Sequence, residues 1–372
     1  MQIKDIAKPP KSLGFDPHRL KRLDDIVKSG IDEGLYPAAS WVVLRHGMAA
    51  SAGALGVINP AGTVQTPASA DTIFDLASVT KSFTGTLLMQ CIEEGRVQLM
   101  QTLASVLPEA AGTPTEHLTL RQLASHSSGL PPWKPLYKVT NRSVLEEILH
   151  TAPEKEPGTH YAYSDLGYIL LGIIVSRLLG KPLDVIAKER IFDPIGMSTA
   201  GYNPPASLNP RIAATGHSRN REGEVIVGQV HDENAHGMGG VAGHAGIFAS
   251  AVDLVRFALA LQYPGVASHF SIQPILGAAA KRVSQHSLID AAVGSHGVGW
   301  FLSPNPYLPP AELLSSRSFG HTGFTGTMFV VDPELDCTMI LLTNRVYSPG
   351  DGGGVLRIRR LFINAALGSI VS

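Results

Sequence analysis

Hydrophobic positions along the chain follow two spacings, and the order of these spacings predicts the architecture. In residues 16–35, apolar side chains recur every three or four positions behind an Asp-Pro start, which predicts an amphipathic helix. Two β-rich runs follow at 39–45 and 50–57, and the His-Gly-Met between them predicts a hairpin. Residues 78–99 return to helical spacing.

The rest of the chain predicts an inserted helical region and a return to strands. From about 100 to 215 the pattern indicates helices joined by Pro- and Gly-rich loops, and a further helix is expected at 251–262. The last third carries strand-like runs and a closing helix: 319–321, 327–331, 338–343 and about 355–367. This order predicts an α/β (α+β) fold, with one antiparallel sheet flanked by helices.

Both ends of the chain are expected to build that sheet. The predicted division assigns 1–95 and 225–372 to the sheet domain and 96–224 to an inserted all-α region. The active site is expected in the cleft between the two.

Composition narrows the classes of function. The 372 residues are 44% hydrophobic and carry a net charge of −1 without a basic patch, so a nucleic-acid partner is not expected. The longest apolar run, near 169–175, is shorter than the roughly 20 residues of a membrane span. As written, the start lacks the apolar stretch of a signal peptide, which indicates a cytoplasmic protein, or a periplasmic or secreted one if a leader was trimmed.

Two further expectations concern cysteines and assembly. Cys91 and Cys337 lie far apart in apolar surroundings and are predicted to be reduced core residues. The expected partner is a small-molecule ester, amide or lactam, bound by a monomer or small homo-oligomer.

The first candidate chemistry is a Ser-x-x-Lys motif, with Ser78 and Lys81 at the start of a helical pattern. Residues three apart share one helix face, so the amine can reach the hydroxyl and act on its proton. Such tetrapeptides also arise by chance, and the alternative is a capping serine with a solvated lysine.

Two later motifs favour the catalytic interpretation of Ser78 and Lys81 over the capping one. Tyr163, in Tyr-Ser-Asp, stands at a junction between a loop and an apolar helix, where a phenol can serve as a general base or acid. His321 opens His-Thr-Gly on a predicted strand, where glycine permits close approach of a ligand. The backbone N–H of Phe324 could join that of Ser78 in an oxyanion hole. Taken singly, Tyr163 could be a core tyrosine and the glycine-rich strand a tightly packed one.

In this order and at these separations, the three motifs resemble those of the serine β-lactamase and penicillin-binding-protein superfamily. The resemblance is greatest to class C β-lactamases and family VIII carboxylesterases, and it extends from about residue 16 to 367. Four supporting segments also resemble family motifs: 118–131, 194–197, 243–248 and 342–346.

The resemblance implies a role for each matching residue. Ser78 would be the nucleophile, Lys81 and Tyr163 the shared base and acid, and the amides of Ser78 and Phe324 the oxyanion hole. No metal or organic cofactor is implied. Four positions would bind substrate: Asp165, His321, Thr322 and Gly323.

Two departures from the family pattern bear on the substrate. His321 replaces a lysine and is mostly neutral at neutral pH, so attraction of an anionic substrate should weaken. Asp165 replaces an asparagine and could pair with Lys81, keeping it protonated and favouring Tyr163 as the base. We therefore expect carboxylesterase-like hydrolysis. The alternatives are a β-lactamase, a D,D-peptidase or D-aminopeptidase acting on cell-wall-type peptides, and a non-catalytic penicillin-binding sensor or scaffold.

Three other patterns are assigned no function. His231, Glu233 and His236 lack the spacing of a zinc helix, and His244 could join them only through a loop; hydrogen bonding near the cleft is the simpler interpretation. Residues 237–242 match GxGxxA without a preceding strand, which argues against a dinucleotide site. The last helix carries arginines that are expected to form a solvated face: Arg357, Arg359 and Arg360.

Overall fold

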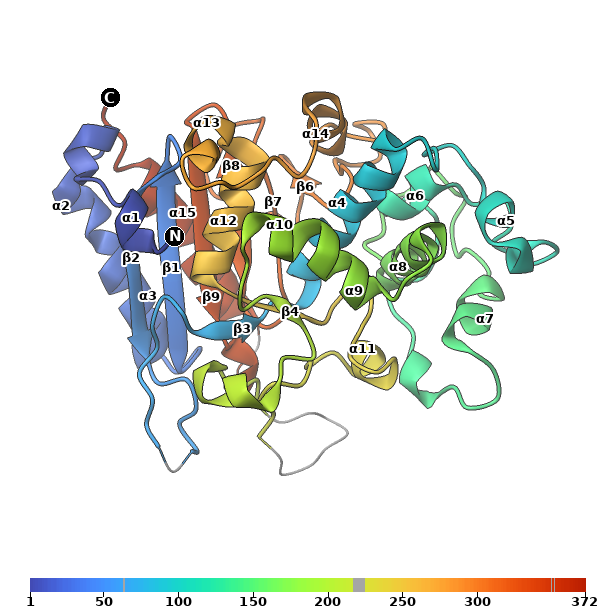
Figure 1. The fold of residues 1–372 in the computed structure, drawn as a ribbon, viewed down its shortest axis with the longest axis horizontal. Helices are drawn as coiled ribbons and strands as arrows, with labels where there is room; N and C mark the ends of the chain where they lie inside the picture. The colour runs from blue at the N-terminus through green and yellow to red at the C-terminus, as the bar shows by residue number, and fades with distance from the viewer. Residues whose placement is uncertain (63, 217–224, 349, 351) are drawn as a thin grey trace.

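Six antiparallel strands form the main sheet of the protein, whose computed structural model describes residues 1–372 apart from 63, 217–224, 349 and 351. The strand order is β2-β1-β9-β8-β7-β6, so the N-terminal hairpin pairs with the C-terminal strands through β1 and β9 (Figure 1). The strands are β1 (Ala38–Arg45), β2 (Met48–Gly56), β6 (Phe301–Leu302), β7 (Phe319–Thr322), β8 (Met328–Asp332) and β9 (Cys337–Thr343). The predicted fold class, with a sheet assembled from both chain ends, is confirmed.

Helices cover both faces of this sheet. Alternate residues of β1 point to opposite cores: Val42 packs with the cluster that includes α12 (Ala251–Gln262), and Val43 packs with the cluster of α3 (Arg22–Asp32) and α15 (Gly353–Leu367). This is the period-two alternation of a strand. In Figure 1, α12 lies across one face and α15 across the other.

Two boundaries predicted from the sequence are corrected. The helix expected at 16–35 is divided at Lys21 into α2 (Pro17–Leu20), capped by Asp16, and α3. The second hairpin strand begins at Met48 instead of residue 50, because His46 and Gly47 alone form the turn. Both turn residues have positive φ, as a two-residue hairpin turn of this twist requires.

A helical region lies beside the sheet and packs around two long helices, α4 (Thr80–Glu93) and α8 (Asp165–Leu179), which contact each other (Figure 1). Its shorter helices are α5 (Leu103–Val106), α6 (Leu120–Ala124), α7 (Val144–Leu149), α9 (Leu183–Ala187), α10 (Asp193–Ile195) and α11 (Glu233–Gly237). Elsewhere the structure has α1 (Ile3–Ile6), α13 (Pro264–Ser268) and α14 (Ala278–Ser284).

A second, three-stranded sheet was not expected from the sequence. It has the order β3-β5-β4, with β3 (Ile73–Asp75), β5 (Ile247–Ser250) and β4 (Gly201–Tyr202). These strands are too short for a periodic signal. The strand β4 falls inside the segment expected to be all-α, and the division into two domains stays a prediction.

Two expectations from composition concern the core and the membrane. Cys91 on α4 and Cys337 on β9 are both buried and unbridged, which confirms them as core residues. Among the described residues, the helices are too short or too polar to cross a membrane.

The hairpin generates a test of core packing. Gly53 pairs across the strands with Trp41, and a Cβ added at Gly53 would lie 2.1 Å from the Trp41 ring. Gly53→Ala should therefore lower the free energy of unfolding by about 1–3 kcal/mol, measured by urea denaturation. Gly265→Ala on α13 is the control, since its Cβ would meet open space; equal effects of the two variants would contradict the packing role.

Candidate active site

Ser78 lies on a strained turn between a strand and a helix. It is the middle residue of the 3-10 turn η2 (Ala77–Val79), which connects β3 to α4. Ala77 has a φ of +46°, a conformation that a residue with a side chain rarely adopts. The carboxylate of Asp75 accepts the Ala77 N–H at 2.9 Å and the His231 N–H at 2.8 Å, and so holds the turn. Burial raises the pKa of Asp75 to about 6.

The amine of Lys81 meets three oxygen atoms in a site closed to solvent. Its Nζ lies 3.0 Å from Ser78 Oγ, 2.7 Å from Asp165 Oδ1 and 3.3 Å from the His244 carbonyl. The contacts with Ser78 and His244 are hydrogen bonds, and the contact with Asp165 is an ion pair. The contact between Lys81 and Asp165 is the one expected from the sequence.

Tyr163 completes this group as a buried phenol just before α8. Its ring centre lies 4.7 Å from Lys81 Nζ, and Tyr307 packs beside it at 5.0 Å. Burial, and then the Asp165 carboxylate, raise the pKa of Tyr163 well above 10, although the Ser78 hydroxyl opposes the rise. The raised pKa favours the neutral phenol, and the role of Tyr163 as a base or acid stays a prediction.

His126 fixes the backbone on both sides of Tyr163. Its carbonyl accepts the N–H of Ala162 at 2.9 Å, and its Nδ1 accepts the N–H of Ser164 at 3.0 Å. The imidazole also packs on the Tyr163 ring at 4.5 Å. Burial, and then His296, lower the pKa of His126 well below 6.5, so the ring is neutral and free to accept at Nδ1. No role was predicted for His126, although its segment, 118–131, resembles a family motif.

The third motif is divided between the cleft wall and the core. Thr322 and Gly323 line the cleft, whereas His321 is fully buried behind it and stacks on Phe301 at 4.2 Å. Burial, and then Lys81, lower the pKa of His321 well below 6.5, which leaves a neutral imidazole. The sequence predicted that His321 would be mostly neutral at neutral pH. The lowered pKa makes the neutral form more dominant than the ordinary histidine pKa implies.

Ser78 and Phe324, whose backbone amides were expected to form an oxyanion hole, both line the cleft. Neither the N–H of Ser78 nor that of Phe324 donates to a protein acceptor among the described residues. Side chains of the third-motif turn hold the two segments together: Thr325 Oγ1 donates to the Asp75 carbonyl at 2.7 Å and Thr327 Oγ1 to the Leu76 carbonyl at 2.9 Å. The oxyanion hole expected from these two amides stays a prediction.

The cleft has a volume of about 530 Å³ and an aromatic rim. Trp133, Tyr307 and Phe324 line it, and each exposes about half of its side chain. Arg345 stacks on Phe324, with its guanidinium 4.2 Å from the ring centre. Single aromatic residues in loops carry no periodic signal, so the sequence did not identify this rim.

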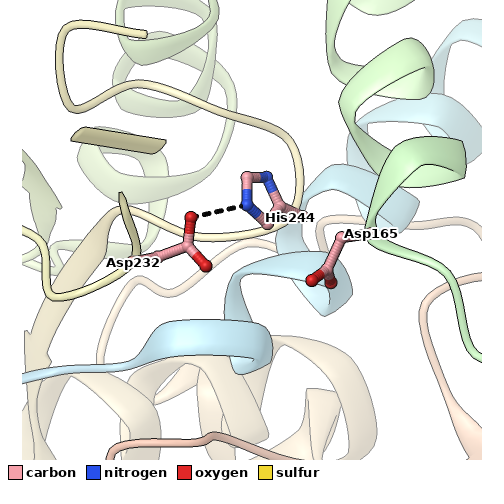
Figure 2. Close-up of side chains that lie close together, drawn as sticks. All are labelled: Asp165, Asp232 and His244. Carbon is pink, nitrogen blue, oxygen red and sulfur yellow. Dashed lines mark hydrogen bonds and ion pairs between the residues drawn. The ribbon is translucent and has the colours of Figure 1, made fainter. Parts of the chain in front are cut away.

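A different trio from the one considered in the sequence could hold a metal ion. Figure 2 shows Asp165 and Asp232 on either side of His244, with His244 Nε2 2.9 Å from Asp232 Oδ1. Burial acts to raise the pKa of Asp232, but the charge and the hydrogen bond of His244 oppose burial, and the pKa is lowered overall. Lys81 already pairs with Asp165 at 2.7 Å, so both carboxylates of the trio have a protein partner.

The solvated face predicted for the last helix is wrong at one position. Arg357 and Arg360 are exposed and pair with Glu33 and Glu312, as expected of a solvated face. Arg359 is only 9% exposed and lines the cleft. Its place one helical turn from the buried residues of α15, Val355 and Phe362, was a signal available in the sequence.

Comparisons with known proteins cover nearly the whole chain. A family model described as Beta-lactamase matches residues 23–362. A protein of Escherichia coli (strain K12) named "Putative D-alanyl-D-alanine carboxypeptidase" is 32% identical, over 91% of this chain and 85% of its own length. A protein of the same name from Salmonella agona (strain SL483) is 29% identical, over 91% and 86%.

Two solved structures share the fold at low sequence identity. The hydrolase EstCE1, described as having promiscuous acyltransferase activity, has a TM-score of 0.74 and 21% identity, covering 94% of this chain and 99% of its own. A β-lactamase/D-alanine carboxypeptidase from Pseudomonas syringae has a TM-score of 0.73 and 22% identity, covering 94% and 98%.

The buried Asp75 predicts a pH dependence of stability. Because its pKa is raised from 3.8 to about 6 on folding, the folded protein binds this proton more tightly, and stability falls as pH rises from 4 to 6. Across this range, the free energy of unfolding of the wild type should fall by about 3 kcal/mol relative to that of Asp75→Asn, measured by urea denaturation at each pH. Parallel pH curves for the two proteins would contradict the assignment.

The protein partners of Asp165 and Asp232 predict weak metal binding at the trio that these residues form with His244. A site with a Kd of 1 μM would stabilise the fold by about 2.7 kcal/mol at 100 μM Zn²⁺. We expect no such rise in the thermal midpoint, and no fall after chelator treatment, because Lys81 and His244 already satisfy the carboxylates. If Zn²⁺ raised the thermal midpoint of the wild type but not that of His244→Ala, the trio would be a metal site and the prediction would be wrong.

Proposed function

Because the chain belongs to the Beta-lactamase family, we propose that it is a serine hydrolase that cleaves an ester or amide bond through an acyl-enzyme on Ser78. One observation carries this proposal: Ser78 Oγ lies 3.0 Å from Lys81 Nζ, in a cleft that also presents Tyr163 and two unused amides. Nucleophile, proton carrier and oxyanion donors are the parts that acyl transfer needs.

The proton route follows from the contacts of Lys81. In the resting site Lys81 is a donor to Ser78, so it must first give a proton to Asp165, at 2.7 Å, before its amine can take the Ser78 proton. The Tyr163 phenol then protonates the leaving group and is reprotonated through Lys81 and Asp165. Water attacks the acyl-enzyme in the second half-reaction, and its proton follows the same groups in reverse.

A carboxylesterase-like substrate fits this cleft best. The third-motif imidazole of His321 is buried and neutral, so it offers no cation to an anionic substrate. The rim formed by Trp133, Tyr307 and Phe324 offers apolar surface to an acyl or alcohol group instead.

A peptidase acting on D-alanyl peptides is the second candidate. The curated relative from Escherichia coli carries that name at 32% identity. Arg345 and Arg359 also line the cleft near Phe324 and supply positive charge that the third motif lacks. A peptide with a free carboxylate would profit from that charge.

The acyl-enzyme is tested by intact mass. The wild type, treated with a fluorophosphonate, should gain one label, and Ser78→Ala should gain none while keeping the same thermal midpoint. Hydrolysis of p-nitrophenyl butyrate should fall at least about a thousandfold in Ser78→Ala. Full hydrolysis by that variant would contradict the proposal.

Substrate class is tested by comparing kcat/KM for p-nitrophenyl butyrate, nitrocefin and a D-Ala-D-Ala peptide. We expect the ester to be preferred over nitrocefin, because His321 offers no cation for the lactam carboxylate. A hundredfold preference for nitrocefin would contradict the ester assignment, and a preference for the peptide would favour the second candidate. Stable labelling by penicillin without turnover of any substrate would indicate a sensor.

A further inference from the structure

Arg359 is a buried cation beside the proposed oxyanion hole. Its side chain extends from α15 to the cleft and is 9% exposed. One terminal nitrogen donates to the Gly323 carbonyl at 2.7 Å and to the Thr327 carbonyl at 2.8 Å. Burial, and then Arg345, lower the pKa of Arg359 to about 9, which leaves it protonated at neutral pH.

The partners of Arg359 set it apart from its neighbours on α15. Arg357 and Arg360 each pair with a glutamate at the surface. Across the described part of the chain, Arg359 has no carboxylate within ion-pair distance, and its Nε is buried without a hydrogen bond. A buried charge without a counter-ion is costly, so its retention calls for a role.

The two carbonyls that it contacts belong to the turn that carries Phe324. In a trans peptide, the C=O of one residue and the N–H of the next point in opposite directions. The guanidinium on the Gly323 carbonyl therefore fixes the orientation of the Phe324 N–H, which points away from that carbonyl in a residue that lines the cleft. A cation on the carbonyl also polarises the peptide and makes its N–H a stronger donor.

The turn keeps its shape by other contacts, so Arg359 is not its only support. The Gly326 N–H donates to the Gly323 carbonyl at 3.0 Å, and the Gly323 N–H donates to the Thr327 carbonyl at 2.8 Å. A Cβ on Gly323 would lie 2.4 Å from the Leu76 carbonyl, so the turn is pressed against the segment before Ser78. Loss of the Arg359 guanidinium should therefore weaken the Phe324 N–H as a hydrogen-bond donor more than it changes the fold of the turn.

We propose that Arg359 is a positioning residue for the oxyanion hole, which orients and polarises the Gly323–Phe324 peptide through the Gly323 carbonyl. The inference rests on the proposed function, because it acts on the oxyanion of a Ser78 acyl transfer. It adds to that function a charged group outside the three motifs.

A sulfur-for-oxygen comparison isolates this role. The thiocarbonyl sulfur of a thionoester is a poor hydrogen-bond acceptor, so a thionoester profits little from an oxyanion hole. In Arg359→Met, we expect kcat for p-nitrophenyl butyrate to fall about 10- to 100-fold with KM nearly unchanged. The rate for the thionobutyrate should fall much less, so the oxygen-to-sulfur rate ratio should drop.

Three further proteins make the experiment decisive. Arg359→Lys keeps a charge and should give an intermediate ratio, and it replaces the methionine variant if that protein does not fold. Added guanidinium should partly restore the ratio in Arg359→Ala. Arg357→Met, a surface arginine on the same helix, should keep the wild-type ratio and rate.

The outcomes separate this inference from the proposed function. A wild-type ratio in the Arg359 variants, whether or not the rates fall, would overturn the inference and leave Ser78 catalysis standing. Wild-type protein that takes up no fluorophosphonate would overturn both.

Discussion

The buried charge of Lys81 is the constraint on which the rest of the site depends. An ammonium group without water needs an oxygen for each of its three donors, and the protein supplies them from three separate segments. Ser78 comes from the same helix turn, Asp165 from the start of α8, and the His244 carbonyl from the loop before β5. Satisfying one cation therefore fixes α4, α8 and that loop relative to one another.

A second set of contacts fixes Ser78 against the sheet. The strained Ala77 turn is held from inside by the Asp75 carboxylate and from outside by Thr325 and Thr327. These threonines come from the turn between β7 and β8 and bond to carbonyls just before Ser78. The distance between the Ser78 and Phe324 amides is thus set by side-chain contacts between the sheet and the start of α4, and not by either segment alone.

Charge is distributed unevenly between the inside and the mouth of the cleft. Behind Tyr163, His126, His296 and His321 are all buried, and burial lowers the pKa of each ring enough to keep it neutral. Lys81 lies beside this imidazole cluster and pairs with Asp165 at 2.7 Å. Arginine charge lies at the Phe324 end, where Arg345 and Arg359 line the cleft.

The sequence alone determined the features that depend on local spacing. The pairing of Ser78 with Lys81 follows from a three-residue separation on a helix. The chain order of the hairpin, the long helices and the strands β7, β8 and β9 followed from their hydrophobic periods. Tertiary structure decided which distant groups meet: Asp232 with His244, His126 with Tyr163, and Arg359 with the third-motif turn. The physical reason is that periodicity states which face of an element is buried, but not what covers that face. An arginine on the apolar stripe of a helix becomes part of a cleft only when the neighbouring strands end beside it.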